Sequence, residues 1–289
     1  MRVVVLGCGY VGLELGRQLD GHEGIGVRRS DAGLAAIEAA GFEAVEADVT
    51  DPDTLDAVPD ADHLVFAASA RGTPARELYV EGQRTVLDEF AARADPPERY
   101  IYTSSTGVYG DQDGDWVDEE TEPAPTTERG KTLLAAEQVA LDGAADRGID
   151  GTVARLAGIY GPDRYRIERY LDGPVVAGYR NTVHRDDAAG AVAFLLREGH
   201  ARGEVVLVAD DDPLSRWAFA DWLAEACDRP APPKQTVAEL LDSDVSAGRR
   251  RRLTSTKRCS NEKLRALGYE FDYPTARAGY REAVETHCD

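Results

Sequence analysis

The chain is poor in lysine and cysteine and has no long apolar run. None of its apolar stretches approaches the ~18 consecutive residues that a membrane-spanning helix needs, so no membrane is expected as a partner. A secretory leader is not expected either, because the first predicted strand begins at Arg2. The four cysteines include no Cys-x-x-Cys pair, which argues against a zinc site and against a redox disulfide. We therefore expect a cytoplasmic protein without a metal site.

Positive charge is also scarce. The chain has 33 lysine and arginine residues against 53 aspartate and glutamate residues, which gives a net charge of -20, and four of the basic residues are lysines. Counterions in a salt-rich cytoplasm screen the repulsion of such an acidic surface and keep the chain soluble. This composition predicts a halophilic source, and it argues against nucleic acid as a partner.

A glycine-rich turn follows the first predicted strand, Arg2–Leu6, and precedes an apolar helix pattern. In a G-x-G-x-x-G turn the first glycine permits the tight bend, the second makes room for a pyrophosphate, and the third lets helix and strand pack closely. The free N–H groups at the start of the helix then face the phosphates. The alternative is a βα turn that binds nothing. The residues expected to contact the dinucleotide are Gly7, Gly9, Tyr10, Val11 and Gly12.

Strands and helices alternate through the first half of the chain. We expect strands at residues 24–28, 43–47, 63–67, 99–103 and 151–156, with long helices at 74–94 and 128–147. This order predicts an α/β fold, a doubly wound parallel Rossmann sheet with a smaller C-terminal substrate lobe. The cofactor domain is expected to span 1–162 and 182–210, and the lobe 163–181 and 211–289. The long polar connection at 106–127 is expected to be a lid or a mobile loop.

The end of the second predicted strand indicates which dinucleotide binds. NAD-binding units place an acidic residue there, whereas NADP-binding units place arginine. This chain has Arg28, Arg29 and Ser30, which can face a 2′-phosphate, and the nearby Asp31 is better explained as a helix cap. We therefore expect NADP(H) rather than NAD(H). The alternative is that both arginines are solvated surface residues.

Several further segments resemble the extended short-chain dehydrogenase/reductase superfamily, the NAD-dependent epimerase/dehydratase family. The matching segments run in the family's order over nearly the whole chain: 48–49, 67–69, 79–82, 103–110, 155–162 and 183–188. The resemblance implies that Asp48 and Val49 contact the adenine and that Ala67, Ala68 and Ser69 lie along the cofactor. It also implies that Leu156 lies at the cofactor, and that the chain forms a homodimer through the helices at 74–94 and 128–147.

The chain departs from this family at its proton relay, a Tyr-x-x-x-Lys pair on the helix after the fifth strand. Aligned with the family's segment, the tyrosine position holds Arg129 and the lysine position holds Leu133. A shifted alignment that uses Lys131 as the lysine places Thr127 at the tyrosine position. In the glycine turn, Leu6 stands where the family's first glycine is expected. With these departures the chain resembles an atypical branch of the family, the YeeZ-like proteins, which lacks the usual tyrosine.

Other side chains must therefore handle the proton. Ser105 matches the family's serine that hydrogen-bonds the reacting oxygen, although it can instead cap the strand end. Arg129 cannot act as a base, but it can polarise a carbonyl or hold an anionic substrate group, unless it is a solvated helix start. Tyr109 is a candidate proton donor. Less specific candidates are Tyr79, Tyr160 and His184 for proton transfer and Arg249–Arg252 for a substrate phosphate, each with a packing or surface role as the alternative.

Two functions are consistent with these residues. The first is an NAD(P)-dependent oxidoreductase of the epimerase/dehydratase group that acts on a small carbonyl or sugar-like substrate without the usual Tyr-x-x-x-Lys pair. The second is a non-catalytic NADP(H)-binding sensor or regulatory protein. Ser105 and the full-length substrate lobe favour the enzyme. Fold alone does not distinguish the two functions.

Overall fold

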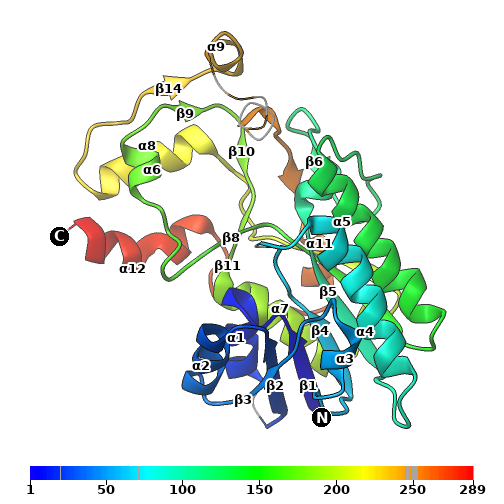
Figure 1. Ribbon diagram of the computed structural model, residues 1–289. Coiled ribbons are helices and arrows are strands. Elements are labelled where there is room, and N and C mark those ends of the chain that lie inside the picture. Colours follow the sequence, from blue (N-terminus) through cyan, green and yellow to red (C-terminus); the bar gives the residue numbers. More distant parts are fainter. Residues whose placement is uncertain (20, 71, 245, 247, 249–252, 289) are drawn as a thin grey trace. The chain divides into compact units, whose positions relative to one another are not determined.

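A seven-stranded parallel sheet forms the core of the nucleotide-binding part of the chain, in the strand order β12-β7-β5-β4-β1-β2-β3 (Figure 1). The central strand β1 carries Val3, Val4 and Val5, all fully buried, as expected for a β-branched strand covered on both faces. The Rossmann-like α/β fold predicted from the alternating pattern is confirmed. The strands span Arg2–Leu6 (β1), Glu23–Arg28 (β2), Glu43–Glu46 (β3), His63–Phe66 (β4), Arg99–Ser105 (β5), Asp150–Leu156 (β7) and Glu204–Val208 (β12).

The structure is a computed structural model that describes residues 1–19, 21–70, 72–244, 246, 248 and 253–288. These residues form two compact units. Unit 1 comprises 1–105, 127–156 and 188–206, and unit 2 comprises 106–126, 157–187 and 207–289. Four stretches that we expected within the cofactor domain group with unit 2: 106–126, 157–162, 182–187 and 207–210.

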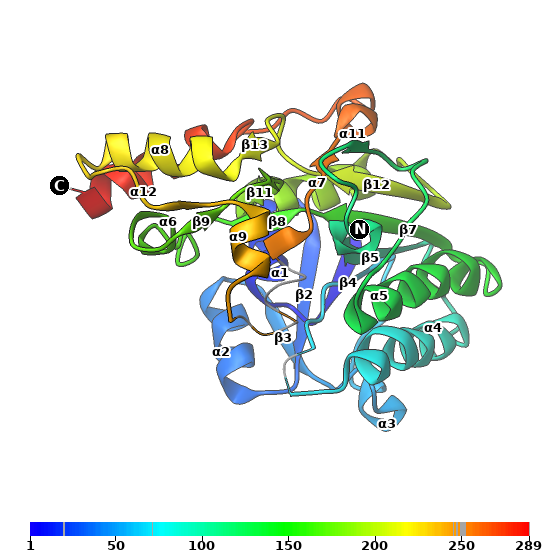
Figure 2. The same ribbon diagram turned by 90° about the horizontal axis from the view of Figure 1, so that it is seen from above.

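Helices cover both faces of the sheet in unit 1. Helices α4 and α5 lie side by side on one face (Figures 1 and 2). On the other face Arg197, at the end of α7, donates a hydrogen bond to the carbonyl of Gln18 at the end of α1. The helices span Tyr10–Gln18 (α1), Asp31–Ala39 (α2), Pro52–Leu55 (α3), Gly82–Ala91 (α4), Glu128–Gln138 (α5) and Arg185–Arg197 (α7).

Both long predicted helices contain a π-helical stretch. Residues Glu77–Glu81 (η1) precede α4, and Val139–Gly143 (η3) follow α5. Each stretch widens the helix by one residue per turn, which hydrophobic periodicity alone does not reveal. Such π-helical turns frequently occur at functional sites.

The strand order indicates at which edge of the sheet a ligand is expected to bind. From β1 the chain adds β2 and β3 on one side, and then crosses to add β4, β5 and β7 on the other. Ligands of doubly wound sheets bind beyond the carboxyl ends of the strands at this switch point. The loops after β1 and β4 are therefore where a dinucleotide is expected.

Unit 2 combines short paired strands with helices around its own apolar core. Phe219, Leu223 and Tyr280 are buried at its centre. The strands are Trp116–Val117 (β6), Gly158–Tyr160 (β8), Val175–Val176 (β9), Tyr179–Arg180 (β10), Thr182–His184 (β11), Leu214–Ser215 (β13), Lys234–Gln235 (β14) and Arg258–Cys259 (β15). The helices are Thr106–Tyr109 (η2), Glu168–Leu171 (α6), Arg216–Ala226 (α8), Val237–Leu241 (α9), Glu262–Ala266 (α11) and Ala276–Cys288 (α12).

The polar connection at 106–126 is tied to a later part of unit 2. Strand β6 pairs in parallel with β15, and the backbone N–H groups of Gln112 and Gly114 both donate to the carbonyl of Thr256. The buried Lys257 side chain donates to the carbonyl of Gly110 at 3.0 Å. Between Gly110 and Val117, the segment expected as a lid or mobile loop is thus held by hydrogen bonds to residues 256–260.

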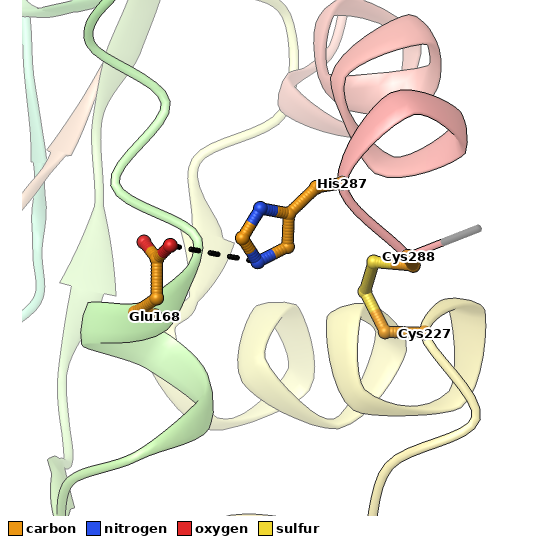
Figure 3. The surroundings of a disulfide bond; sticks show 4 residues. All are labelled: Glu168, Cys227, His287 and Cys288. Carbon is orange, nitrogen blue, oxygen red and sulfur yellow. Dashed lines mark ion pairs between the residues drawn. A yellow bond between two sulfur atoms is a disulfide. The ribbon is translucent and has the colours of Figure 1, made fainter.

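A disulfide joins Cys227 at the end of α8 to Cys288 at the end of α12 (Figure 3). Beside it, His287 lies 3.6 Å from the Glu168 carboxylate. The cysteines are 61 residues apart, so sequence spacing gave no indication of the bond. The packing of α12 on α8 is what brings the two sulfur atoms together.

Candidate functional site

Gly7 makes the sharp turn at the carboxyl end of β1. Its φ of +77° belongs to the left-handed region that glycine tolerates. A Cβ atom at this position would lie 2.3 Å from the Cα atom of Ala68 and 2.6 Å from its backbone nitrogen, so a side chain has no room. The turn is fixed by hydrogen bonds from the N–H groups of Gly7 and Cys8 to the Val27 carbonyl, both 3.1 Å. The loops after β1 and β4 therefore meet at Gly7 and Ala68.

The other two glycines of the turn lie at the start of α1. A Cβ atom on Gly12 would lie 2.9 Å from a Val5 methyl carbon, so the third glycine permits the close packing of α1 on β1. Gly9 caps α1 and has no side chain to bond the first N–H groups of the helix, which lack intrahelical partners. Those groups can bind a pyrophosphate. The geometry of the turn fits a dinucleotide.

Arg28 extends from the end of β2 across the glycine turn to the start of α2. Its Nη1 atom donates to the Cys8 carbonyl at 3.4 Å and would lie 2.9 Å from a Cβ atom on Gly9. At its other side, a Cβ atom on Gly33 would meet the Arg28 Nε atom at 2.8 Å and the Ser30 hydroxyl at 3.0 Å. Ser30 is the N-cap residue of α2, and its side chain makes no capping hydrogen bond. The Arg28 guanidinium and the Ser30 hydroxyl thus lie close together at the N-terminus of α2.

Arg29 has a different environment. Its guanidinium forms an ion pair with Asp48 at 3.0 Å, and the other carboxylate oxygen of Asp48 accepts from the N–H and hydroxyl of Thr50. Partial burial acts to raise the pKa of Asp48, but the bonds from Thr50 and Arg29 outweigh it and lower this pKa. The adjacent Val49 is buried. The two arginines that looked equivalent in the sequence therefore differ, because Arg29 already has a carboxylate partner.

The loop after β4 carries the second predicted cofactor segment. Ala67 donates its N–H to the Leu6 carbonyl at 2.9 Å, which holds this loop beside the glycine turn. Ala68 packs against Gly7, and Ser69 is exposed. The next residue, Ala70, donates its N–H to the hydroxyl of Tyr79 at 3.0 Å.

Ser105 ends β5, half-buried and paired in register with the buried Leu156 of β7. Its neighbour Ser104 faces the interior and donates a hydrogen bond of 2.6 Å to Glu137 of α5. Glu137 in turn forms a buried ion pair with Arg155 at 2.7 Å. Sequence reasoning did not single out Ser104 or Glu137. The signal was available, because a charged residue at a core-facing position of a helix needs a buried partner.

The two positions of the family's proton relay are occupied here by Leu133 and Arg129, which have different environments. Leu133 is 6% exposed and contributes to the core. Arg129 stands in the first turn of α5, where the Thr127 hydroxyl caps the helix by accepting from the Gly130 N–H. The Arg129 Nη2 atom lies 3.5 Å from the hydroxyl of Tyr79 on η1. Arg129 is exposed, and its guanidinium lies within hydrogen-bond distance of Tyr79.

The remaining predicted catalytic candidates lie in unit 2. Tyr109 is fully buried, and its hydroxyl donates to the Asp118 carbonyl at 2.5 Å. Tyr160 stacks on Tyr280 with ring centroids 4.9 Å apart. His184 is 1% exposed among aromatic rings, including Tyr160. Arg249–Arg252 fall outside the described residues.

A comparison with protein families shows to which family the chain belongs. The model of the "NAD dependent epimerase/dehydratase family" matches residues 3–229. The chain belongs to this family. Protein YeeZ of Escherichia coli (strain K12) is 29% identical over 283 residues, which cover 94% of this chain and 96% of that protein. The predicted membership and the likeness to YeeZ are confirmed.

Solved structures show the same fold over nearly the whole chain. A conserved protein of unknown function from Silicibacter pomeroyi is 30% identical, with a TM-score of 0.79 and coverage of 99% of this chain and 98% of that one. The dTDP-glucose 4,6-dehydratase of Bacillus anthracis, solved with NAD, is 17% identical with a TM-score of 0.79 and coverage of 99% and 96%. The second likeness concerns the fold alone.

Members of the epimerase/dehydratase family bind nicotinamide cofactors and act on small molecules. In the part of the chain that the structure describes, no group of three or more His, Cys, Asp or Glu side chains is placed to hold a metal ion. Within the same residues, no helix has both the length and the apolar character needed to cross a bilayer.

Proposed function

We propose that this protein is an NADP(H)-dependent oxidoreductase that acts on the carbonyl or hydroxyl of a small sugar-like molecule. The observation that carries the cofactor preference is the position of Arg28 between the glycine turn and the start of α2, beside the Ser30 hydroxyl. A 2′-phosphate dianion placed there has a guanidinium, a hydroxyl and helix N–H groups as donors. NAD(H) lacks that phosphate and makes no use of these donors.

The other predicted cofactor contacts follow from the same edge of the sheet. Gly7, Gly9 and Gly12 leave room for the pyrophosphate at the N-terminus of α1. Asp48 and Val49 are assigned to the adenine. A nicotinamide bound along this edge supplies hydride-transfer chemistry. Further cofactor contacts in this proposal are Tyr10, Val11, Ala67, Ala68, Ser69 and Leu156.

Ser105 and Arg129 are the proposed groups at the reacting centre. Ser105 ends β5 at the carboxyl edge of the sheet, where its hydroxyl can hydrogen-bond a substrate oxygen. Arg129 can polarise a carbonyl, because a guanidinium keeps its positive charge. We do not assign proton transfer to Tyr109, since its phenol hydrogen is donated to a backbone carbonyl.

The cofactor assignment is tested by titrating the protein with NADPH and NADH. We expect tighter binding of NADPH, and Arg28→Ala should weaken NADPH about 10- to 100-fold, the effect of removing a hydrogen bond to a charged group, with little change for NADH. Arg29→Ala is the matched control and should have the smaller effect, because Arg29 is paired with Asp48. Equal losses for both nucleotides on Arg28→Ala would refute the NADP preference.

The second candidate function is a non-catalytic NADP(H) sensor. It is favoured by the apolar Leu133 at the family's lysine position. A panel of carbonyl compounds and nucleotide sugars distinguishes the two. Oxidation of NADPH with any member supports the enzyme, whereas tight binding without turnover supports the sensor. The homodimer through α4 and α5 stays a prediction, and sedimentation of the purified protein would test it.

A further inference from the structure

A tyrosine on the π-helical turn η1 stands beside the arginine that replaces the family's tyrosine. We propose that Tyr79 donates the proton to the reacting oxygen, and that Arg129 supplies the positive charge which stabilises the resulting phenolate. This inference rests on the proposed oxidoreductase function. It assigns the proton step, which the residues at the family's own relay positions cannot perform.

The hydrogen bonds of Tyr79 leave its own proton available. Its oxygen accepts from the Ala70 N–H at 3.0 Å and from the Arg129 guanidinium at 3.5 Å. Both bonds use the oxygen as acceptor, so the phenol hydrogen must point to a third partner. Among the described residues no acceptor for it is present. The side chain is 4% exposed, which keeps the hydroxyl in a largely water-free environment.

The location of Tyr79 suits a substrate oxygen as that partner. Ala70 belongs to the loop after β4, which also carries the cofactor segment 67–69 and packs on the glycine turn at Gly7. Arg129 stands at the start of α5, on the helix where the family's relay tyrosine is expected. The hydroxyl therefore lies between two elements of unit 1 that border the switch point of the sheet. The π-helical backbone at 77–81 is a further mark of a functional position.

Arg129 can perform the electrostatic task of the family's lysine. A phenolate forms when Tyr79 gives up its proton, and two donors, one of them positively charged, already face its oxygen. Such preorganised donors stabilise charge that develops during reaction. Leu133, at the lysine position, is apolar and buried and supplies no charge.

The neighbouring tyrosine does not compete for this role. Tyr102 on β5 is fully buried, and Ser104 is the hydrogen-bonding side chain beside it. Burial, together with nearby Tyr79 and Glu137, raises the pKa of Tyr102 well above its usual value, so it keeps its proton. Tyr79, by contrast, has two donors placed to stabilise its ionised form.

The proton balance of the step is simple. In the direction of reduction, a bound reduced nicotinamide would supply the hydride that adds to the carbonyl carbon, and the electron pair of the C=O π bond would move to the oxygen. That oxygen takes the proton of Tyr79 as the new O–H bond forms. The phenolate of Tyr79 then regains a proton from water. Oxidation of an alcohol runs through the same steps in reverse.

The test compares Tyr79→Phe and Arg129→Met with the wild type, and uses Tyr100→Phe as the matched control. Tyr100 is a buried tyrosine of β5 whose hydroxyl donates to Gln83. With a carbonyl substrate found in the panel, Tyr79→Phe should lower kcat about 100- to 10,000-fold, the usual contribution of a general acid. Its affinity for NADPH should stay within about threefold, since the phosphates are assigned to the glycine turn and to Arg28. Arg129→Met should also lower kcat. A third variant, Arg129→Ala, should lose rate in the same way, and added guanidinium ion should restore part of that loss.

A second readout separates proton donation from a structural role. Tyr79→Phe should lose kcat while its KM for the carbonyl substrate and its Tm stay close to those of the wild type and of Tyr100→Phe. Wild-type turnover by Tyr79→Phe would overturn the proposal and leave the oxidoreductase function standing. If the wild type itself oxidises no NADPH with any member of the panel, the proposed function fails.

Discussion

Removing one partner of the buried ion pair between Glu137 and Arg155 should cause a large loss of stability. Arg155 contacts both carboxylate oxygens of Glu137, at 2.7 Å through Nη2 and at 3.1 and 3.2 Å through Nε, and the side chains are 5% and 3% exposed. Arg155→Leu leaves the carboxylate buried with Ser104 as its side-chain donor among the described residues. Breaking such a pair costs about 3–5 kcal/mol. Because the Ser104 bond remains, we expect the free energy of unfolding to fall by about 3 kcal/mol. At about 2–4 °C per kcal/mol, this loss lowers Tm by roughly 6–12 °C.

The assay is thermal unfolding followed by circular dichroism at one salt concentration. The double variant Glu137→Leu/Arg155→Leu should recover most of the loss, because two apolar side chains of similar size replace two charges that must otherwise be desolvated. Lys131→Ala is the matched control. It breaks an exposed pair with Glu128, 61% and 89% exposed, and should cost at most about 1 kcal/mol. The reasoning is refuted if Arg155→Leu loses no more than Lys131→Ala, or if the double variant is no more stable than Arg155→Leu.

Three further predictions concern pH, redox state and salt. Burial raises the pKa of Asp210 from 3.8 to about 7, so stability should fall as pH rises between these values and then level, and Asp210→Asn should flatten that fall in urea titrations. Reduction of the Cys227–Cys288 disulfide should destabilise the protein by up to about 4 kcal/mol, as expected for opening a loop of 61 residues. The controls Cys8→Ser and Cys259→Ser replace free cysteines, so reductant should destabilise these variants as much as the wild type. Molar KCl should raise Tm strongly, because it screens a net charge of -20.

Each of these predictions has a clear contrary result. A pH profile of Asp210→Asn that matches the wild type would show that Asp210 does not titrate in this range in the folded protein. Equal Tm with and without reductant would argue that the disulfide carries no stability. Equal stability in dilute buffer and in molar salt would contradict the halophilic origin.

The local features of the nucleotide-binding part were predictable from sequence. Each expected strand from 24–28 to 151–156 is present within about two residues, because period, flanking glycine and β-branched content act over a few neighbouring residues. The glycine turn was equally predictable, because its three glycines lie within six residues at a fixed spacing. In the structure Gly7 has a positive φ and packs against Ala68, which explains why a glycine is needed there. The π-helical stretches were missed, because a one-residue widening leaves the apolar pattern nearly unchanged.

The sequence proposed members for the candidate site, but it did not show how their side chains pair. Arg28 and Arg29 are adjacent in sequence and look alike, yet Arg29 pairs with Asp48 while Arg28 lies over the glycine turn. Tyr79 and Arg129 were separate candidates, 50 residues apart, until the fold placed their polar atoms 3.5 Å from each other. Ion pairs and hydrogen bonds between distant segments depend on how whole elements pack, and no local pattern encodes that packing.

By itself the sequence determined the α/β class, the dinucleotide turn and the loss of the Tyr-x-x-x-Lys pair, since each depends on residue types at short, fixed spacings. Only the tertiary structure decided which arginine pairs with Asp48, which tyrosine stands beside Arg129, and which cysteines are joined. Those outcomes depend on distances between side chains of separate elements. Such distances exist only after the apolar faces of those elements have been buried together.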